Sequence, residues 1–284
     1  LDMADANLRL EGAADAASPE KSLDLLNQAR CCYSRALDLD HQCAAAYLGL
    51  NALLEDLGEV DTARALAQDA MVSAGLWDNH LQRPAHWIPG IQAKAWHGPQ
   101  LPAARHLESG LGSVLPELRA FAQDVRTEWH HYPHHAFSGD VMDVKVLMGL
   151  LPGWYQVKSR GGEESDLQAL LMADTSPEED GHVECPQTLE LLSTDPSIAE
   201  AAHMGVGFAV LARLGSGARL SPRCGASNAR LTCVRVLSEA EDGGVCVLEV
   251  GSTPPRRLEP RSGVQVFDDS FEHSFTNTSR VDAC

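Results

Sequence analysis

The chain has few basic residues for its length and no long apolar run. It carries 22 Lys and Arg against 40 Asp and Glu in 284 residues, a formal net charge of −18. Because a phosphate backbone requires a basic surface, this balance argues against nucleic acid as a partner and against docking on anionic lipid. No stretch approaches the roughly 18 consecutive apolar residues of a membrane span, and no signal peptide is visible.

The cysteines lack the spacing of a structural zinc site. No Cys-x-x-Cys pair occurs among the eight, which are Cys31, Cys32, Cys43, Cys185, Cys224, Cys233, Cys246 and Cys284. Paired cysteines at short spacing are the usual zinc signature, and a chain of this size does not need a disulfide framework. We therefore expect mostly free, partly buried thiols.

The first part of the chain is predicted to be helical. Apolar residues recur at intervals of three and four across residues 20–76, and Gly58 interrupts the pattern. Ala29 and Ala63 lie 34 residues apart, as do Ala36 and Ala70. That period is the length of a tetratricopeptide repeat, so residues 1–76 resemble tetratricopeptide-like hairpins; a generic helical hairpin is the alternative. One and a half repeats are too few for a long peptide groove.

The remainder predicts mixed structure, so the fold class is α+β. Residues 77–102, rich in Pro and Gly, indicate a linker, and residues 101–126 an amphipathic helix. Short apolar runs between turns predict strands of a β-sandwich or jelly roll, at residues 154–158, 207–214, 231–237, 245–250 and 264–268. The cluster of His130, His131, His134 and His135 is interpreted as a solvated loop, and residues 161–184 as an acidic, exposed insertion.

Four segments resemble one family. They are Arg83–His97, Cys185–Leu192, Ser221–Leu231 and Val266–His273 (VFDDSFEH). Together they look like the aspartyl/asparaginyl β-hydroxylases, which are Fe(II)- and 2-oxoglutarate-dependent oxygenases. The resemblance implies a jelly-roll (double-stranded β-helix) domain over residues 103–284, reached through the linker 77–102. It further implies that the last strand of that domain is absent, because the chain stops at Cys284.

The resemblance also implies a chemistry and a set of site residues. Family members hydroxylate Asp or Asn side chains of peptides or proteins and hold Fe(II) on two histidines. His273 takes one ligand position, and Asp268 and Asp269 before it are expected to turn the chain and orient the ring by hydrogen bonding. Arg280 is a candidate to bind the 2-oxoglutarate carboxylate, because Arg binds carboxylates bidentately.

Other family positions are occupied by residues that do not suit the chemistry. Arg223 stands at the first ligand position, and a protonated guanidinium has no lone pair for a metal. Cys224 is one residue out of register and His203 precedes the first core strand, so neither is expected to replace it. Three positions that help to bind 2-oxoglutarate in the family are here Thr232, Val234 and Ala212. Retention of Fe(II) and 2-oxoglutarate is therefore doubtful.

Three functional hypotheses follow. The first is a dioxygenase with a rebuilt metal site. The second is a catalytically inactive family member that acts as a binding or scaffold module for a peptide or protein, and the third is a truncated, degenerate product. The compartment stays open between the endoplasmic reticulum, if an anchor precedes Leu1, and the cytoplasm.

Overall fold

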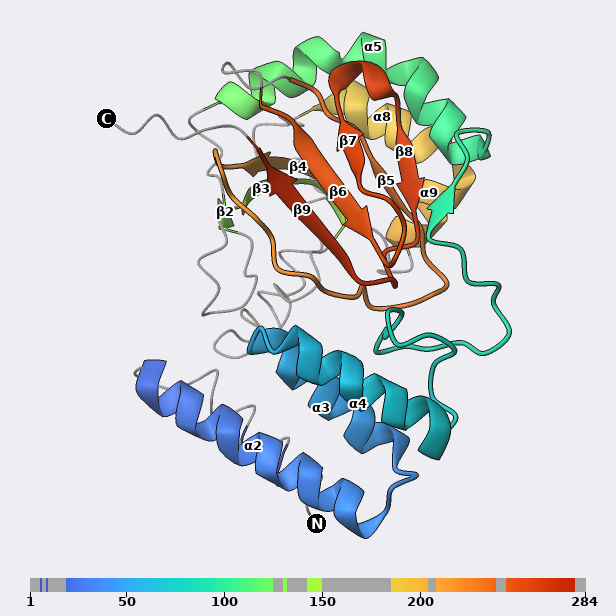
Figure 1. Ribbon diagram of the computed structural model, residues 1–284. Helices are drawn as coiled ribbons and strands as arrows, with labels where there is room; N and C mark the ends of the chain where they lie inside the picture. The colour runs from blue at the N-terminus through green and yellow to red at the C-terminus, as the bar shows by residue number, and fades with distance from the viewer. Residues whose placement is uncertain are drawn as a thin grey trace.

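The computed structural model describes Ala6, Arg9 and residues 19–124, 130–131, 142–149, 185–203, 208–238 and 244–278. Three helices form a layer below the rest of the molecule (Figure 1). They are α2 (Pro19–Leu39), α3 (Ala44–Asp56) and α4 (Val60–Ser73). The predicted interruption is confirmed, since α3 ends at Asp56 and Gly58 adopts a φ of 73° in the following turn. Glycine reaches that left-handed conformation without steric cost.

Small side chains let the three helices pack closely. Ala29, Ala63, Ala67 and Ala70 are fully buried at these contacts. A side chain at Gly49 on α3 would place its Cβ 2.5 Å from the Tyr33 ring on α2, so glycine is required there. Assignment of the region to tetratricopeptide repeats stays a prediction.

The described strands form three antiparallel sheets of three strands. One contains β1 (Trp96–His97), β8 (Gln265–Phe267) and β5 (Thr232–Val234). A second contains β2 (His130–His131), β3 (Met142–Gly149) and β4 (Phe208–Leu214). The third contains β7 (Arg256–Leu258), β6 (Cys246–Val250) and β9 (His273–Asn277). The mixture of helices and sheets supports the α+β class, whereas the jelly roll stays a prediction.

One aromatic core joins the first and third sheets. Trp96 of β1 and Phe267 of β8 pack with their ring centroids 5.9 Å apart. The same cluster contains Leu248 and Val250 of β6 and Leu258 of β7. Alternation along each strand directs these side chains to one face, and their burial holds β8 against β6 and β7.

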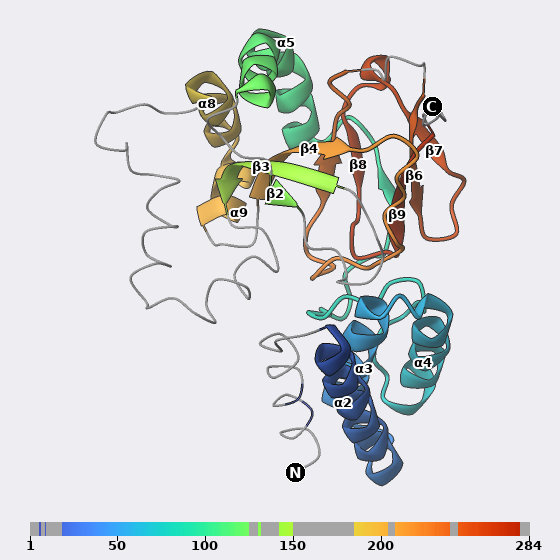
Figure 2. The same ribbon diagram turned by 90° about the vertical axis from the view of Figure 1, so that its left-hand side faces the viewer.

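Further helices lie above and beside the sheets (Figures 1 and 2). They are α5 (Pro102–Gln123), α8 (Pro186–Thr194) and α9 (Pro196–His203), and a short 3₁₀ helix spans Pro260–Ser262. Glu117 of α5 accepts hydrogen bonds from the backbone N–H groups of Gln187 and Thr188, at 3.0 and 2.7 Å. The carboxylate thereby satisfies amides that the first turn of α8 leaves unpaired. No helix among the described residues is long and apolar enough to cross a membrane.

Most predicted elements are present, with one correction. The helices expected at 101–126 and 185–192 and the strands expected at 207–214, 231–237, 245–250 and 264–268 are confirmed with shifted or shortened bounds. His130 and His131 were interpreted as part of a loop, which is wrong: they form β2 and pair with Val144 and Asp143. A two-residue strand is too short to show a period in the sequence. His134, His135, the expected strand 154–158 and the insertion 161–184 lie outside the described residues.

Candidate functional site

The site is built around the turn between β8 and β9. The Asp268 carboxylate accepts hydrogen bonds from the backbone N–H of Ser270, at 3.0 Å, and from its hydroxyl, at 2.5 Å. Gln82 donates to the other Asp268 oxygen at 3.2 Å and to the Ser270 hydroxyl at 2.8 Å. An aspartate that bonds the backbone two residues ahead stabilises a turn. Asp268 therefore shapes the loop that delivers the chain to His273.

His273 begins β9 and pairs with Val250 of β6. Its Nδ1 lies 2.9 Å from the backbone carbonyl oxygen of Phe271. This hydrogen bond and a second one to the backbone of Asp269 orient the ring, and the charge of Asp269 acts on the ring as well. A neutral imidazole that donates from Nδ1 keeps its lone pair on Nε2.

The surroundings of His273 favour the uncharged ring. Burial lowers the pKa of His273, and the positive charge of Arg223 lowers it further. The Asp269 charge and the Phe271 carbonyl act in the opposite direction. Contacts with the rings of Phe267 and Phe275, at centroid distances of 5.3 and 6.4 Å, complete the apolar surroundings.

Arg223 lies directly opposite His273. The backbone N–H of Arg223 donates to the His273 carbonyl at 3.1 Å, and the N–H of His273 donates to the Arg223 carbonyl at 2.8 Å. The two residues therefore form an isolated antiparallel bridge. Directly opposed residues of an antiparallel pair project their side chains to the same face, and both residues line the same cavity. The guanidinium thus shares the side of the sheet on which the His273 ring lies.

A second contact between the motif segments Ser221–Leu231 and Val266–His273 depends on a glycine. The N–H of Gly225 donates to the Asp269 carbonyl at 2.6 Å. A Cβ at Gly225 would lie 2.6 Å from the Asp269 carboxyl carbon, so only glycine permits this approach. Arg230 then binds the Asp269 carboxylate at 2.6 Å, with side-chain exposures of 20% and 9%. Gly225 and Arg230 of the first segment consequently hold Asp269 of the second.

Asn228 connects the same segment to the linker. Its Oδ1 accepts from the Ile88 N–H at 2.9 Å, and its Nδ2 donates to the Ile88 carbonyl at 2.8 Å. One buried side chain therefore satisfies both backbone groups of Ile88, which explains the amide at this motif position. Sequence reasoning assigned no role to Asn228, Gly225 or Arg230, although their presence in a specific motif was the available signal.

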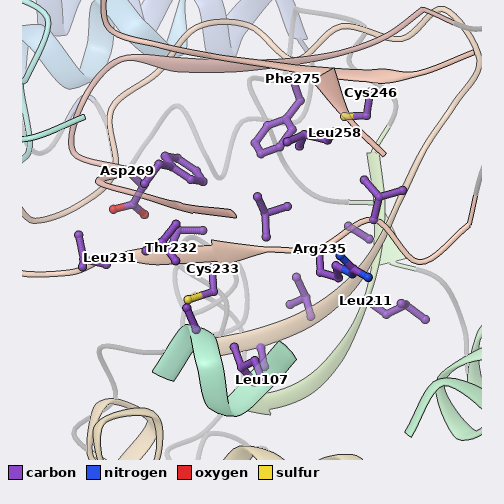
Figure 3. Close-up of a pocket in the computed structure, with 18 of the residues that line it drawn as sticks. Leu107, Leu211, Leu231, Thr232, Cys233, Arg235, Cys246, Leu258, Asp269 and Phe275 are labelled. Carbon is purple, nitrogen blue, oxygen red and sulfur yellow. The ribbon is translucent and has the colours of Figure 1, made fainter. Parts of the chain in front are cut away.

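A cavity of about 1850 Å³ adjoins the bridge between Arg223 and His273. Its wall includes α5, α9 and the strands β4, β5, β6 and β9, and Figure 3 shows Thr232, Arg235, Asp269 and Phe275 around it. Thr232, Val234 and Ala212 also line it. A hydroxyl and two small apolar side chains thus stand on this wall at the positions discussed for 2-oxoglutarate, and none carries a charge that would bind a carboxylate.

The residues present do not fit Fe(II). Two imidazoles, usually with a carboxylate, are the common ligand set for such iron, and the residue opposite His273 is a guanidinium. No group of three His, Cys, Asp or Glu side chains in the described part of the chain could hold a metal ion. Burial also raises the pKa of Cys224 well above its ordinary value, which keeps the thiol protonated and unsuited to a metal.

Two sequence candidates are not placed at this site. The side chain of His203, at the end of α9, and the whole of Arg280 lie outside what the structure describes. That His203 does not bind a metal, and that Arg280 binds 2-oxoglutarate, both stay predictions. The residues that the structure does bring together are His273, Arg223 and Asp269.

Comparison with known proteins agrees with these motifs. The comparison with curated proteins finds no match. The family model described as Aspartyl/Asparaginyl beta-hydroxylase matches residues 144–282. This span contains both motif segments that meet at the bridge between Arg223 and His273. Through residues 144–282 the chain therefore belongs to the aspartyl/asparaginyl β-hydroxylase family.

Proposed function

We propose that this family member binds a peptide or protein in its cavity and does not hydroxylate it. The observation that carries the proposal is the pairing of Arg223 with His273 by two backbone hydrogen bonds. Iron in this family is expected between two opposed histidines, and here one of them is replaced by a permanent cation. Fe(II) with 2-oxoglutarate would supply O₂ activation if bound, but no step of that reaction is assigned to these residues.

Charge supports the same conclusion. A dication and a guanidinium about 4 Å apart repel each other by about 8 kcal/mol at an effective dielectric constant of 20. A single neutral imidazole cannot offset a repulsion of that size, because imidazole ligands bind divalent ions firmly only in sets. The family's charged 2-oxoglutarate contacts are also replaced, at Thr232 and Val234.

The alternative is a dioxygenase that hydroxylates Asp or Asn side chains. One observation favours it: the Nδ1 of His273 is bound to a carbonyl oxygen, at 2.9 Å. Metal-binding histidines commonly make such a hydrogen bond through the nitrogen that does not bind the metal. The hydrogen bond from His273 to Phe271 would orient one metal ligand, but it does not supply the second ligand that iron requires.

Anaerobic titration with Fe(II) and 2-oxoglutarate separates the two functions. We expect no metal-to-ligand charge-transfer band and no succinate on addition of O₂. A peptide retained by the immobilised protein should stay bound after iron chelation. A band that saturates near one equivalent of Fe(II), coupled to succinate formation, would refute the binding function.

Restoring the missing ligand provides the second test. Arg223→His removes the cation and places an imidazole across from His273, so Fe(II) affinity should rise at least about tenfold, as for regaining one ligand-orienting contact. Arg219→His is the matched control, because it adds a histidine four residues away at a side chain that is 63% exposed. Equal gains in both variants would show that the bridge position has no special relation to the metal.

A further inference from the structure

A buried cluster of charged residues lies between the helical layer and the site. Its centre is Arg83, whose side chain is fully buried. Arg83 Nη2 lies 2.8 Å from Glu55 of α3 and 2.9 Å from Glu272. Its Nε donates to the Asn51 side chain at 3.0 Å, and its Nη1 donates to the His80 carbonyl at 2.5 Å. Every nitrogen of this guanidinium therefore has a partner.

Glu272 is held from both sides. Arg64 of α4 binds it through Nε at 3.1 Å and through Nη2, and Arg83 binds the same carboxylate. The Glu272 side chain is only 6% exposed. Its backbone N–H donates to the Leu81 carbonyl at 2.7 Å. Glu272 immediately precedes His273. The start of β9 is therefore bound by Arg64 of α4 and by Arg83 of the linker, which in turn binds α3.

Every buried charge in this cluster has an opposite partner. Arg64 and Arg83 oppose Glu55 and Glu272, and the exposed Asp61 is a further carboxylate on Arg64. A buried ion is tolerated only when an opposite charge and hydrogen bonds compensate for lost hydration. Burial raises the pKa of Glu55 even though Arg83 acts in the opposite direction. The arrangement is therefore sensitive to the loss of any one member.

We propose that Arg83 is a positioning residue. It ties Glu272 to helix α3, while Arg64 ties it to helix α4, and together they hold the backbone of His273 in register with Arg223. The helical layer is on this view part of the site and not an appended module. The inference needs neither metal binding nor turnover, so it stands apart from the proposed function. It predicts that loosening the cluster loosens the bridge between Arg223 and His273 before the rest of the protein.

Hydrogen exchange followed by mass spectrometry tests the proposal. In Arg83→Gln, amides of residues 268–277 should exchange at least about tenfold faster, because local opening exposes hydrogen bonds of that unit first. Amides of α5 serve as the internal reference. Arg83→Lys retains the charge and should recover part of the protection.

Arg30→Gln is the matched control. It breaks an ion pair of 2.6 Å with Glu59 inside the helical layer, without contact to Glu272. It should leave residues 268–277 unchanged. If Arg83→Gln does not fold, the same exchange measurement on Arg64→Gln tests the proposal, because this variant removes one half-buried contact to Glu272. Exchange that accelerates uniformly, or equally in Arg30→Gln, or not at all in residues 268–277, would overturn the proposal.

Discussion

Replacement of Gly225 by alanine is the most direct test of the contact between the two motif segments. The new Cβ would lie 2.6 Å from the Asp269 carboxyl carbon and 2.7 Å from both carboxylate oxygens. Real Cβ atoms do not approach other atoms so closely, so Asp269 must move. Its movement is opposed by the ion pair with Arg230 at 2.6 Å and by the backbone hydrogen bond from Gly225 at the same distance.

The magnitude follows from two effects. Overpacking a tight site costs about 1–3 kcal/mol, and complete loss of a buried ion pair costs about 3–5 kcal/mol. Asp269 shifts without leaving Arg230 entirely, so we expect Gly225→Ala to lower the free energy of unfolding by about 2–4 kcal/mol. Since about 1 kcal/mol corresponds to about 2–4 °C in a domain of this size, the melting temperature should fall by roughly 4–16 °C.

The chain offers a control of opposite sign. Gly112 lies inside helix α5, and a Cβ there would meet no atom within 4 Å. Alanine is favoured over glycine in a helix interior by about 1 kcal/mol, so Gly112→Ala should raise the melting temperature. Calorimetry of both variants measures the contrast. A stability gain in Gly225→Ala similar to that in Gly112→Ala would show that the segments do not approach as described.

Two further predictions concern titration and reactivity. Burial lowers the pKa of His273, so the unfolded chain takes up this proton at a higher pH than the native protein, and stability that is present above about pH 6.5 is lost as the pH falls. Between pH 7.5 and 5, urea unfolding should show a larger loss of unfolding free energy in the native protein than in His273→Asn. An equal loss in both proteins would contradict this prediction. Burial raises the pKa of Cys246 to about 11, so at pH 8 this residue has about 100-fold less thiolate than an ordinary thiol. Cys246 should therefore be alkylated far more slowly than the exposed Cys31. Equal labelling of the two cysteines in a peptide map would show that Cys246 is not buried.

The motif Val266–His273 identified the family, but its sequence did not indicate which residues its polar side chains contact. The segment VFDDSFEH identified the family from the sequence, yet each polar residue in it has a partner distant in the chain. Asp268 binds Gln82, Asp269 binds Arg230, and Glu272 binds Arg64 and Arg83. These partners are separated from the motif by 39 to 208 residues, and no local pattern links residues across such distances.

The sequence by itself determined the family, the α+β class, the helical start and most of the longer elements. Periodicity and turn residues are local signals, so they located α5, β4 and β6 well. They missed β1, β2, β3, β7 and β9, of which β2 and β3 pair with each other. The resemblance also predicted that Arg223 stands at the position of a histidine ligand of the family.

Only the tertiary structure decided what surrounds that position. The bridge between Arg223 and His273, the approach of Gly225 to Asp269 and the grip of Arg83 on Glu272 all join segments that are distant in the chain. Such contacts depend on how sheets and helices pack, and packing is a property of the whole folded chain. On our proposal, helices α3 and α4 therefore contribute to the placement of His273, through Arg83 and Arg64 on Glu272.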